Sequence, residues 1–447
     1  MFTTILDHLE KVGSTPSSLR LSNDFQALKR LNMISSSCLT NGLSRYRPTA
    51  PCIERNWRWL VVMVCALIAT GCSPPTRLAA VPQRDELSMN VGSMQAIRYY
   101  PPDQLGSLQA DAVDAVGRER AALAAAGHEG PLPPASYLAV SGGGEDGAFG
   151  AGLLIGWTET GTRPEFKVVT GVSTGALTAP FAFLGPAYDR QLEEIYTTLT
   201  AANVLETRGY LAAIFDDAMA DTAPLRRTIA KYMTEDLLAA IAREHAKGRI
   251  LLIGTTNLDL RRGVIWNIGK IAASGDPGAL ELVRTILVAS AAIPGAFPPV
   301  MFDVTVDGQP YQEMHVDGGA SAQVFVYPPS LKIAEAAKEL GIERQRDVYV
   351  IRNARLDAEW ADVKRDTMSI AGRAISSLIQ TQGVGDLYRI YAVSQRDRVG
   401  FHLAYVPSSF DVKLVEPFDP TYMRALFELG HTLGAQGYPW LEQPPSY

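Results

Sequence analysis

The sequence predicts a three-layer α/β/α domain with a mainly parallel central sheet, and three observations lead to this fold class. Continuously apolar runs typical of buried strands occupy 136–140, 166–170, 250–256, 263–267 and 347–352. Strands of this kind are usually covered by helices on both faces. Segments of helical character separate them, at 148–160, 176–184, 277–292, 363–394 and 421–433. Ordinary globular composition, with 47% hydrophobic and 20% charged residues, excludes fibrous, collagen-like and disordered chains.

The first 71 residues are predicted to be a signal region. Arg55 and Arg58 precede an apolar run at 59–70 that ends in Gly71-Cys72. Positive charge, a short apolar run and a small-residue junction describe a secretory signal. The run is short for a helix that must cross a hydrocarbon layer of ~30 Å. A membrane anchor helix that happens to end in Gly-Cys is the alternative. Because about fifty residues precede the signal, we expect the true translation start downstream of Met1, as late as Met33 or an unusual codon beyond it.

The junction Ala69-Thr70-Gly71-Cys72 resembles a bacterial lipobox. This resemblance implies that Cys72 is diacylated and becomes the first mature residue, and Ser73 implies sorting to the outer membrane. We therefore expect a lipid-anchored protein of the bacterial cell envelope that faces the periplasm. No cysteine follows Cys72, so the expected mature chain has no thiolate metal site and no cysteine nucleophile.

The remaining chain is predicted to have three parts. Residues 72–135 are rich in proline and contain one alanine-rich helical stretch at 108–126, so we expect a lipid-anchored tether and a packing helix. Residues 136–331 are predicted to form the catalytic core. Residues 332–447 are predicted to form a C-terminal α/β extension that packs on the same domain. A formal net charge of −6 makes a broad basic face for nucleic acid unexpected. Oligomeric state is not readable from the sequence.

A glycine-rich loop, Ser141-Gly142-Gly143-Gly144-Glu145-Asp146-Gly147, separates a predicted strand from a predicted helix. Such glycines expose backbone N–H groups to an anion at the amino terminus of the helix. The spacing Gly142-x-Gly144-x-x-Gly147 also matches a dinucleotide-binding fingerprint. That interpretation needs an acidic residue at the end of the next strand, and this strand ends in Thr170-Gly171. We therefore expect an anion-stabilising loop rather than a nucleotide site.

A second motif, Gly171-Val172-Ser173-Thr174-Gly175, follows the next predicted strand. It has the spacing of a nucleophile elbow, in which a tight turn presents the serine hydroxyl and the flanking glycines leave room around it. The alternative is that Ser173 merely caps a helix.

A third motif, His315-Val316-Asp317-Gly318-Gly319, offers a base for the serine. Serine is a poor nucleophile unless a base takes its proton. None of the six histidines lies in a distinctive motif, so a direct contact between Asp317 and Ser173 is the economical arrangement.

Taken in this order, the three motifs resemble the patatin-like phospholipase family over about 137–330. A fourth segment at 289–300, with the turn Ile293-Pro294-Gly295, agrees with it. The resemblance implies a patatin-like fold and a lipid acyl hydrolase that works through a Ser–Asp dyad and an acyl-enzyme. It implies Ser173 as nucleophile and Asp317 as base, and its motif glycines are Gly171, Gly175, Gly318 and Gly319. It implies an oxyanion hole formed by Gly142, Gly143, Gly144 and Gly147.

The chain departs from the family at one position of the glycine loop. The family commonly carries Arg or Lys before the last loop glycine, whereas this chain has Asp146 beside Glu145. Two acids there could repel an anionic head group. The expected substrates are therefore membrane lipids or other acyl esters. The sequence supports cleavage of acyl esters in general more strongly than cleavage of phospholipid in particular.

Two alternatives to the dyad remain open. The first is a Ser–Asp–His esterase that uses His402 or His431, both of which follow Asp317 in the chain. The second is a lipid-anchored binding protein with a relict site. No metal or cofactor is expected, since the sequence has no His-Glu-x-x-His motif and no cysteine pair after the signal.

Overall fold

The computed structural model describes residues 76–85, 89–207 and 218–445. The apolar run 59–70, Cys72 and the expected translation start lie outside these residues. Among the helices in the described ranges, none combines the length and the apolar character needed to cross a membrane.

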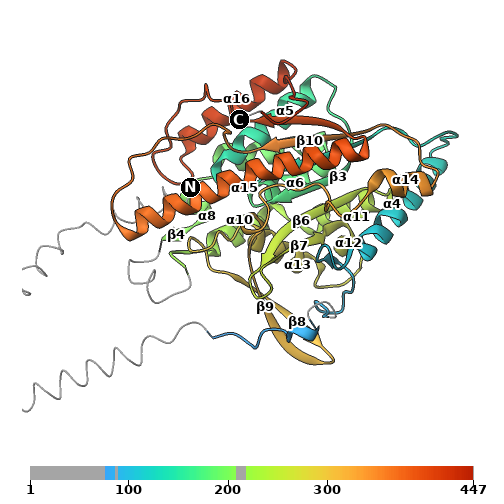
Figure 1. The fold of residues 1–447 in the computed structure, drawn as a ribbon, viewed down its shortest axis with the longest axis horizontal. Helices are drawn as coiled ribbons and strands as arrows, with labels where there is room; N and C mark the ends of the chain where they lie inside the picture. The colour runs from blue at the N-terminus through green and yellow to red at the C-terminus, as the bar shows by residue number, and fades with distance from the viewer. Residues whose placement is uncertain (1–75, 86–88, 208–217, 446–447) are drawn as a thin grey trace, which may run out of the picture.

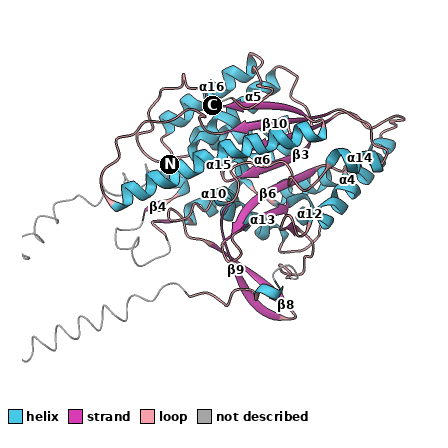
Figure 2. Ribbon diagram, viewed as in Figure 1, coloured by secondary structure: helices cyan, strands magenta, loops and turns pink. Residues whose placement is uncertain are grey.

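Nine strands in the described part of the chain form one mixed sheet with the order β1-β7-β6-β3-β2-β10-β11, and the β8–β9 hairpin joins it at β6 (Figures 1 and 2). Five neighbouring strands, from β6 to β11, are parallel, and the pairs involving β1, β7, β8 and β9 are antiparallel. The strands are β1 Arg98–Tyr99, β2 Ala135–Val140, β3 Phe166–Val172, β6 Ile250–Asn257, β7 Arg262–Asn267, β8 Val300–Val306, β9 Gln309–Asp317, β10 Arg346–Arg352 and β11 Gly400–Tyr405. A separate ribbon pairs β4 Glu206–Thr207 with β5 Ala220–Asp221.

Helices cover both faces of the sheet, which gives the predicted three layers. The helices are α4 Leu105–Ala125, α5 Gly147–Glu159, α6 Thr174–Leu184, α7 Asp189–Thr198, α8 Ala201–Val204, α10 Ala223–Tyr232, α11 Glu235–Ala246, α12 Ile268–Ala272, α13 Ala279–Ser290, α14 Ile333–Glu339, α15 Thr367–Asp397 and α16 Pro420–Ala435. The large core cluster joins α5, α6, α7, α10, α11, α13 and α16 to one face. Two smaller clusters hold α4, α14 and α15 against the other face. The predicted fold class is thus confirmed.

Connection handedness explains this division of the helices. The units β2-α5-β3 and β3-α6-β6 advance along the sheet in one direction, whereas β10-α15-β11 advances in the other. Right-handed crossovers in opposite directions place their helices on opposite faces. The direction changes beside β2, and ligands of open α/β sheets bind at such a point, outside the carboxyl ends of the strands.

The residues after 331 continue the same sheet. Strand β10 pairs directly with β2, from Arg346 opposite Ala135 to Ile351 opposite Val140. Helix α16 packs against α5 at very short range, because a Cβ at Gly152 would lie 2.1 Å from the Phe427 carbonyl oxygen. The amino-terminal segment is also integrated, since β1 pairs with β7. Residues 76–135 therefore contribute to the sheet in addition to supplying the packing helix α4.

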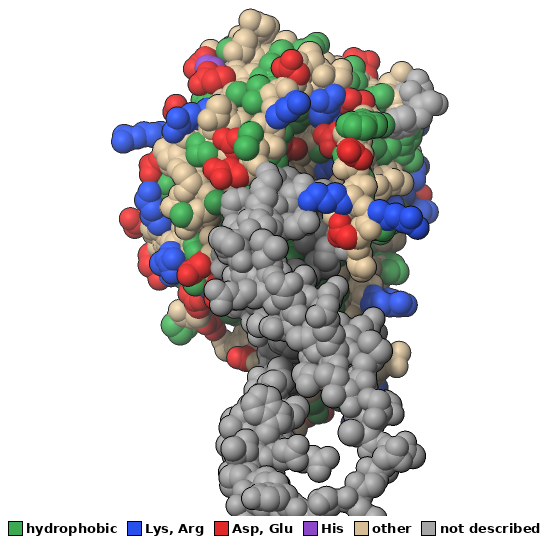
Figure 3. Space-filling model, turned by 90° about the vertical axis from the view of Figure 1, so that its left-hand side faces the viewer, with side chains coloured by type: hydrophobic (Ala, Val, Ile, Leu, Met, Phe, Trp, Pro, Cys, Tyr) green, Lys and Arg blue, Asp and Glu red, His purple; other side chains and the backbone are tan. Residues whose placement is uncertain are grey.

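Several elements carry weak sequence signals and are found only in the structure. Strand β8 is one of them, because its side chains alternate between buried and exposed positions along an antiparallel hairpin. On the surface in Figure 3, acidic and basic side chains are interspersed, and no large area of one sign stands out among the described residues.

Candidate active site

Ser173 occupies a sharp turn between β3 and α6. Its backbone has φ 56° and ψ −126°, a left-handed conformation that is uncommon for a residue with a side chain. The Ser173 N–H donates to Ser290 Oγ at 3.0 Å, and that hydroxyl donates to the Gly254 carbonyl oxygen at 2.7 Å. Ser290, from the segment 289–300, therefore fixes the turn that presents Ser173.

Two flanking glycines make this turn possible. A Cβ at Gly175 would lie 2.2 Å from the Val140 carbonyl oxygen, and one at Gly171 would lie 2.4 Å from the Gly175 carbonyl oxygen. Any side chain at either position would force β2, β3 and α6 apart. The two motif glycines thus bring the Ser173 turn against the end of β2.

Asp317 ends β9 and lies beside Ser173, although 144 positions separate them in the sequence. Its N–H donates to the Ala292 carbonyl oxygen at 2.8 Å, and Oδ1 accepts the Gly319 N–H at 2.7 Å. Its Oδ2 is buried and accepts no hydrogen bond of normal geometry from the described residues. The Ser173 hydroxyl nevertheless interacts with this carboxyl group, so the structure brings the two predicted residues together.

Burial sets the protonation behaviour of Asp317. Desolvation of the charged form raises the pKa of Asp317 to about 7, while contacts with the Ser173 hydroxyl and the Gly319 N–H act in the opposite direction. A carboxyl group with this pKa can accept a proton and return it near neutral pH.

The two glycines after Asp317 have different environments. A Cβ at Gly318 would lie 2.4 Å from the Gly254 carbonyl oxygen, so β6 and this turn need a glycine for their close contact. A Cβ at Gly319 would meet the Gln323 side-chain amide at 2.5 Å. Gln323 in turn donates from Nε2 to the Gly319 carbonyl oxygen at 3.0 Å.

Of the four glycines predicted to supply oxyanion donors, two already use their N–H groups. The Gly142 N–H donates to the Gln323 carbonyl oxygen at 3.0 Å, and the Gly147 N–H donates to the carbonyl oxygens of Gly144 and Glu145. The N–H groups of Gly143 and Gly144 donate to no residue in the described ranges. The candidate donors are therefore narrowed to Gly143 and Gly144.

A buried arginine, Arg352, holds the peptide that carries one of these donors. The Gly142 carbonyl oxygen accepts from Ser141 Oγ at 2.6 Å and from Arg352 Nη1 at 3.3 Å. In a trans peptide the carbonyl and the following N–H point in opposite directions. The Gly143 N–H is therefore directed away from the guanidinium group.

Arg352 keeps its charge in this environment. Burial lowers the pKa of Arg352 to about 10, and the carboxyl groups of Asp146 and Asp386 act against this decrease. Arg352 is not among the site residues predicted from the sequence. It ends a predicted parallel strand, and the carboxyl ends of parallel strands meet at one edge of a sheet, but its contacts there depend on which strand lies beside β2.

The loop also fits closely against the residue after Arg352. A Cβ at Gly143 would lie 1.9 Å from the Asn353 carbonyl oxygen, so no other residue fits there. The Asn353 N–H donates to Ser141 Oγ at 2.8 Å, and its side-chain amide donates to the Ser141 carbonyl oxygen at 3.0 Å. The end of β10 thus determines the shape of the glycine loop.

Asp146, which departs from the family pattern, contacts the C-terminal part of the chain. Its Oδ1 accepts a hydrogen bond from the Tyr422 hydroxyl of α16 at 2.6 Å. Burial, and secondarily the nearby Glu145 carboxyl, raise the pKa of Asp146 to about 7. Asp146 therefore bears only part of a negative charge at neutral pH.

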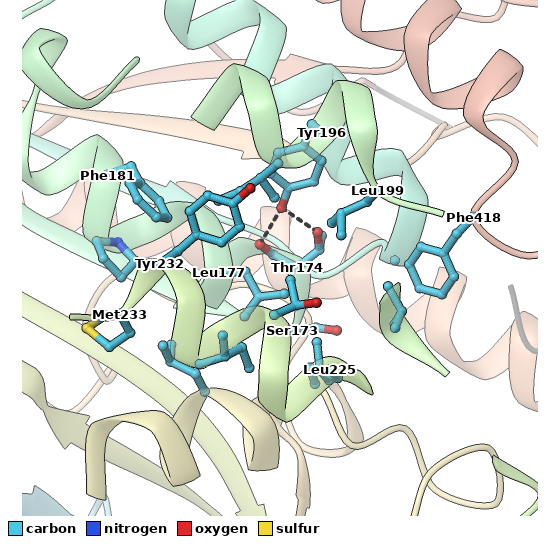
Figure 4. A pocket seen from close by; sticks show the side chains of 18 of the residues that line it. Ser173, Thr174, Leu177, Phe181, Tyr196, Leu199, Leu225, Tyr232, Met233 and Phe418 are labelled. Carbon is cyan, nitrogen blue, oxygen red and sulfur yellow. Dashed lines mark hydrogen bonds between the residues drawn. The ribbon is translucent and has the colours of Figure 1, made fainter. Parts of the chain in front are cut away.

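An apolar pocket of about 830 Å³ opens beside Ser173. Its walls come from α6, α7, α10 and α13, and Figure 4 shows Ser173 among apolar side chains of these elements. Tyr196 lies in the wall with its hydroxyl bonded to Thr174 Oγ1 at 2.7 Å. A site of this kind suits a hydrocarbon chain whose polar end lies at the serine.

The histidines considered for a triad lie in other places. His402 Nε2 is 3.1 Å from Asp347 Oδ1, near the amino end of β10, whereas Ser173 follows the carboxyl end of β3. His431 Nε2 is 3.0 Å from Glu159 Oε1, at the end of α5 opposite the glycine loop. His315 is fully buried, and its Nδ1 lies 2.9 Å from Thr255 Oγ1. In the ranges that the structure describes, no group of three or more His, Cys, Asp or Glu residues could hold a metal ion.

Comparison with protein families gives a match to part of the chain. The family model described as patatin-like phospholipase matches residues 138–328, which contain the glycine loop, Ser173 and Asp317. Residues 138–328 form a patatin-like phospholipase domain. The resemblance drawn from the four motifs is therefore confirmed.

Solved structures similar to this chain include VipD from Legionella pneumophila and the type III effector protein ExoU. VipD is 12% identical, with 68% of this chain and 66% of VipD covered and a TM-score of 0.34. ExoU is 14% identical, with 68% of this chain and 53% of ExoU covered and a TM-score of 0.30. The aligned part thus spans slightly less than two thirds of VipD and about half of ExoU. No curated protein matches the chain.

The residues that complete the site lie partly outside the matched range of the patatin-like domain. Arg352 ends β10, Asn353 follows it, and Tyr422 lies in α16, all beyond residue 328. The glycine loop is therefore held by contacts from the C-terminal part of the chain.

Proposed function

We propose that the protein is a lipid acyl hydrolase of the phospholipase A or esterase type, with Ser173 as nucleophile and Asp317 as its base. The patatin-like domain supports a lipid hydrolase in general terms. The observation that carries the finer proposal is the contact of Ser173 and Asp317 beside an apolar pocket and the unpaired amides of Gly143 and Gly144.

In the proposed first step, Ser173 Oγ attacks the ester carbonyl carbon and its proton passes to Asp317. The carbonyl oxygen becomes an oxyanion, which the N–H groups of Gly143 and Gly144 stabilise. Preorganised donors of this kind typically contribute about 2.7–4 kcal/mol each. The carbon–oxygen bond to the alcohol then breaks, Asp317 returns the proton to the leaving alkoxide, and an acyl-enzyme remains.

In the second step, water gives a proton to Asp317 and its oxygen attacks the acyl carbonyl. The bond to Ser173 Oγ breaks, Ser173 regains the proton, and a fatty acid leaves. Arg352 does not touch the substrate in this scheme. It is a positioning residue, which holds the Gly142 carbonyl so that the Gly143 N–H faces the oxyanion.

The pocket favours an aliphatic acyl chain as the part of the substrate that enters. Phospholipid is compatible with the loop, because Asp146 is half-buried, bonded to Tyr422 and close to the charge of Arg352. We further propose that the protein is anchored by diacylated Cys72 in the cell envelope, at the outer membrane facing the periplasm. That proposal rests on the sequence, since Cys72 lies outside the described residues.

The activity is expected to rise with pH through about 7. Asp317 must be deprotonated to accept the Ser173 proton, and its pKa is raised to about 7, so kcat/KM falls about tenfold per pH unit well below that value. A pH-stat assay on a neutral short-chain ester between pH 5 and 9 measures this. Asp146 has a similar pKa, so Asp146→Asn serves as the matched control and should keep the midpoint. A flat profile in the wild type, or loss of the midpoint in the control, would contradict the role of Asp317.

Replacement of either candidate histidine is expected to leave the reaction intact. His402→Ala and His431→Ala each remove a surface contact with a carboxylate, far from the carboxyl ends of the strands. Their kcat/KM values should stay within about threefold of the wild type. A general base typically contributes 10²–10⁴-fold, so a loss of about that size in either variant would favour the Ser–Asp–His alternative.

A further inference from the structure

A second large cavity, of about 1120 Å³, lies on the face of the sheet opposite to the Ser173 pocket. Its floor includes Tyr137, Val168 and Leu252, while the neighbouring residues Leu138, Val169 and Leu251 belong to the core on the other face. Successive side chains of a strand point to opposite faces, so the two cavities are separated by the sheet. Residues of α4 and α14 also line the cavity, and the two helices are labelled near each other in Figure 1.

The walls of this cavity are mostly apolar, and apolar side chains also lie at its opening. Val113 of α4 and Leu340, directly after α14, both line the cavity and are both 38% exposed. The cavity lies where the hydrophobic core on this face is divided into two separate clusters.

One end of the cavity carries an excess of positive charge. Lys167, Arg344 and Arg346 line it together with a single carboxylate, that of Glu119. Lys167 Nζ and Arg344 Nη1 both lie 2.9 Å from Glu119 Oε1. The other acid in the lining, Asp111, is paired with Lys270 Nζ at 3.0 Å.

The charge at this end is not fully compensated by the protein. The Arg344 side chain is only 7% exposed, yet its Nε has no hydrogen-bond partner among the described residues. Arg346 contacts the Arg344 carbonyl oxygen and the Tyr137 hydroxyl, and no carboxylate in the described ranges is bonded to it. Buried donors of this kind are normally satisfied, and a carboxylate from outside would satisfy them.

We propose that this cavity binds a long-chain fatty acid, with its carboxylate at Arg344 and Arg346 and its hydrocarbon chain along α4 and α14. An apolar chain matches the walls, and an anionic end has the sign that this end of the cavity attracts, since three cations there face one carboxylate. The site is distinct from the Ser173 pocket and does not require the proposed hydrolysis, although a fatty acid is the product class of that reaction.

Photo-crosslinking tests this site directly. The purified full-length protein is labelled with a diazirine-bearing long-chain fatty acid, and the modified peptides are identified by mass spectrometry. Labels in 105–125 and 333–340 are expected, and an excess of dodecanoate should compete while dodecanol competes at least about tenfold more weakly. Labels confined to 174–184 and 223–232, around Ser173, would overturn the proposal, as would equal competition by the alcohol.

Two variants and a control make the test specific. Arg346→Gln removes one cation without breaking the Glu119 pairs, and Ala336→Trp fills the cavity from α14. Each should reduce labelling of 105–125 and 333–340 about tenfold or more. Arg120→Gln removes an exposed cation of α4 that does not line the cavity, and it should label like the wild type. Thermal melting establishes which variants fold. Wild-type labelling in a folded Arg346→Gln or Ala336→Trp protein would refute the site.

Discussion

Replacement of Ser173 by alanine is expected to abolish ester turnover while the protein stays folded. The Ser173 hydroxyl is the proposed nucleophile that forms the acyl-enzyme, so kcat/KM should fall by at least about 10⁴-fold. The backbone at φ 56° is equally strained with serine or alanine, and the N–H bond to Ser290 does not involve the side chain. The melting temperature should therefore change little.

Labelling with a fluorophosphonate probe provides an independent measurement. The wild type should be labelled at Ser173, Ser173→Ala should not react, and Ser330→Ala, which removes an exposed hydroxyl, should react normally. Retained turnover in Ser173→Ala would refute the nucleophile. An unreactive wild type would instead favour a lipid-anchored binding protein with a relict site.

Replacement of Arg352 by methionine is expected to lower kcat by about 10²-fold with little change in KM. The guanidinium group is buried, holds the Gly142 carbonyl and lies near two carboxyl groups, those of Asp146 and Asp386. Without it the Gly143 N–H loses its fixed direction, and losing one oxyanion donor costs about 10²–10³-fold in kcat. Substrate binding in the apolar pocket does not involve Arg352, so KM should be maintained.

Two further variants separate positioning from mere stability. Arg352→Lys keeps a positive charge beside the loop and should recover part of kcat. Arg389→Gln removes the exposed partner of Asp386 without touching the glycine loop, and it should keep nearly full kcat. A lower melting temperature in Arg352→Met with wild-type kcat would show that Arg352 only stabilises the fold.

The parallel strands and the order of their motifs could be predicted because each buried strand is a continuous apolar run that ends in a short glycine-containing sequence. The contact of Ser173 and Asp317 was expected from their motifs and from the family resemblance rather than from this pattern, since Asp317 is the last residue of the antiparallel strand β9. The hairpin of β8 and β9 was not predicted, because alternating side chains beside prolines give a weak signal.

Which loop glycines use their N–H groups within the protein could not be predicted from the sequence. Gly142 and Gly144 look alike in the sequence, and only the position of Gln323, far along the chain, decides that Gly142 uses its N–H inside the protein. Arg352 and Tyr422 were not assigned to the site for a similar reason. Their roles depend on which strand lies beside β2 and which helix packs on α5, and these are facts of topology.

The position of β10 has a consequence for where the functional unit ends. Strand β10 lies between β2 and β11, so a fragment that ends at residue 328 would lack β10. The edge of β2 that faces β10 would then be unpaired, directly before the glycine loop. A bare strand edge of this kind promotes association between copies. The stretch that the family model matches is thus shorter than the stretch that forms the site. Recombination between residues 328 and 346 would separate Ser173 from the residues that shape its surroundings.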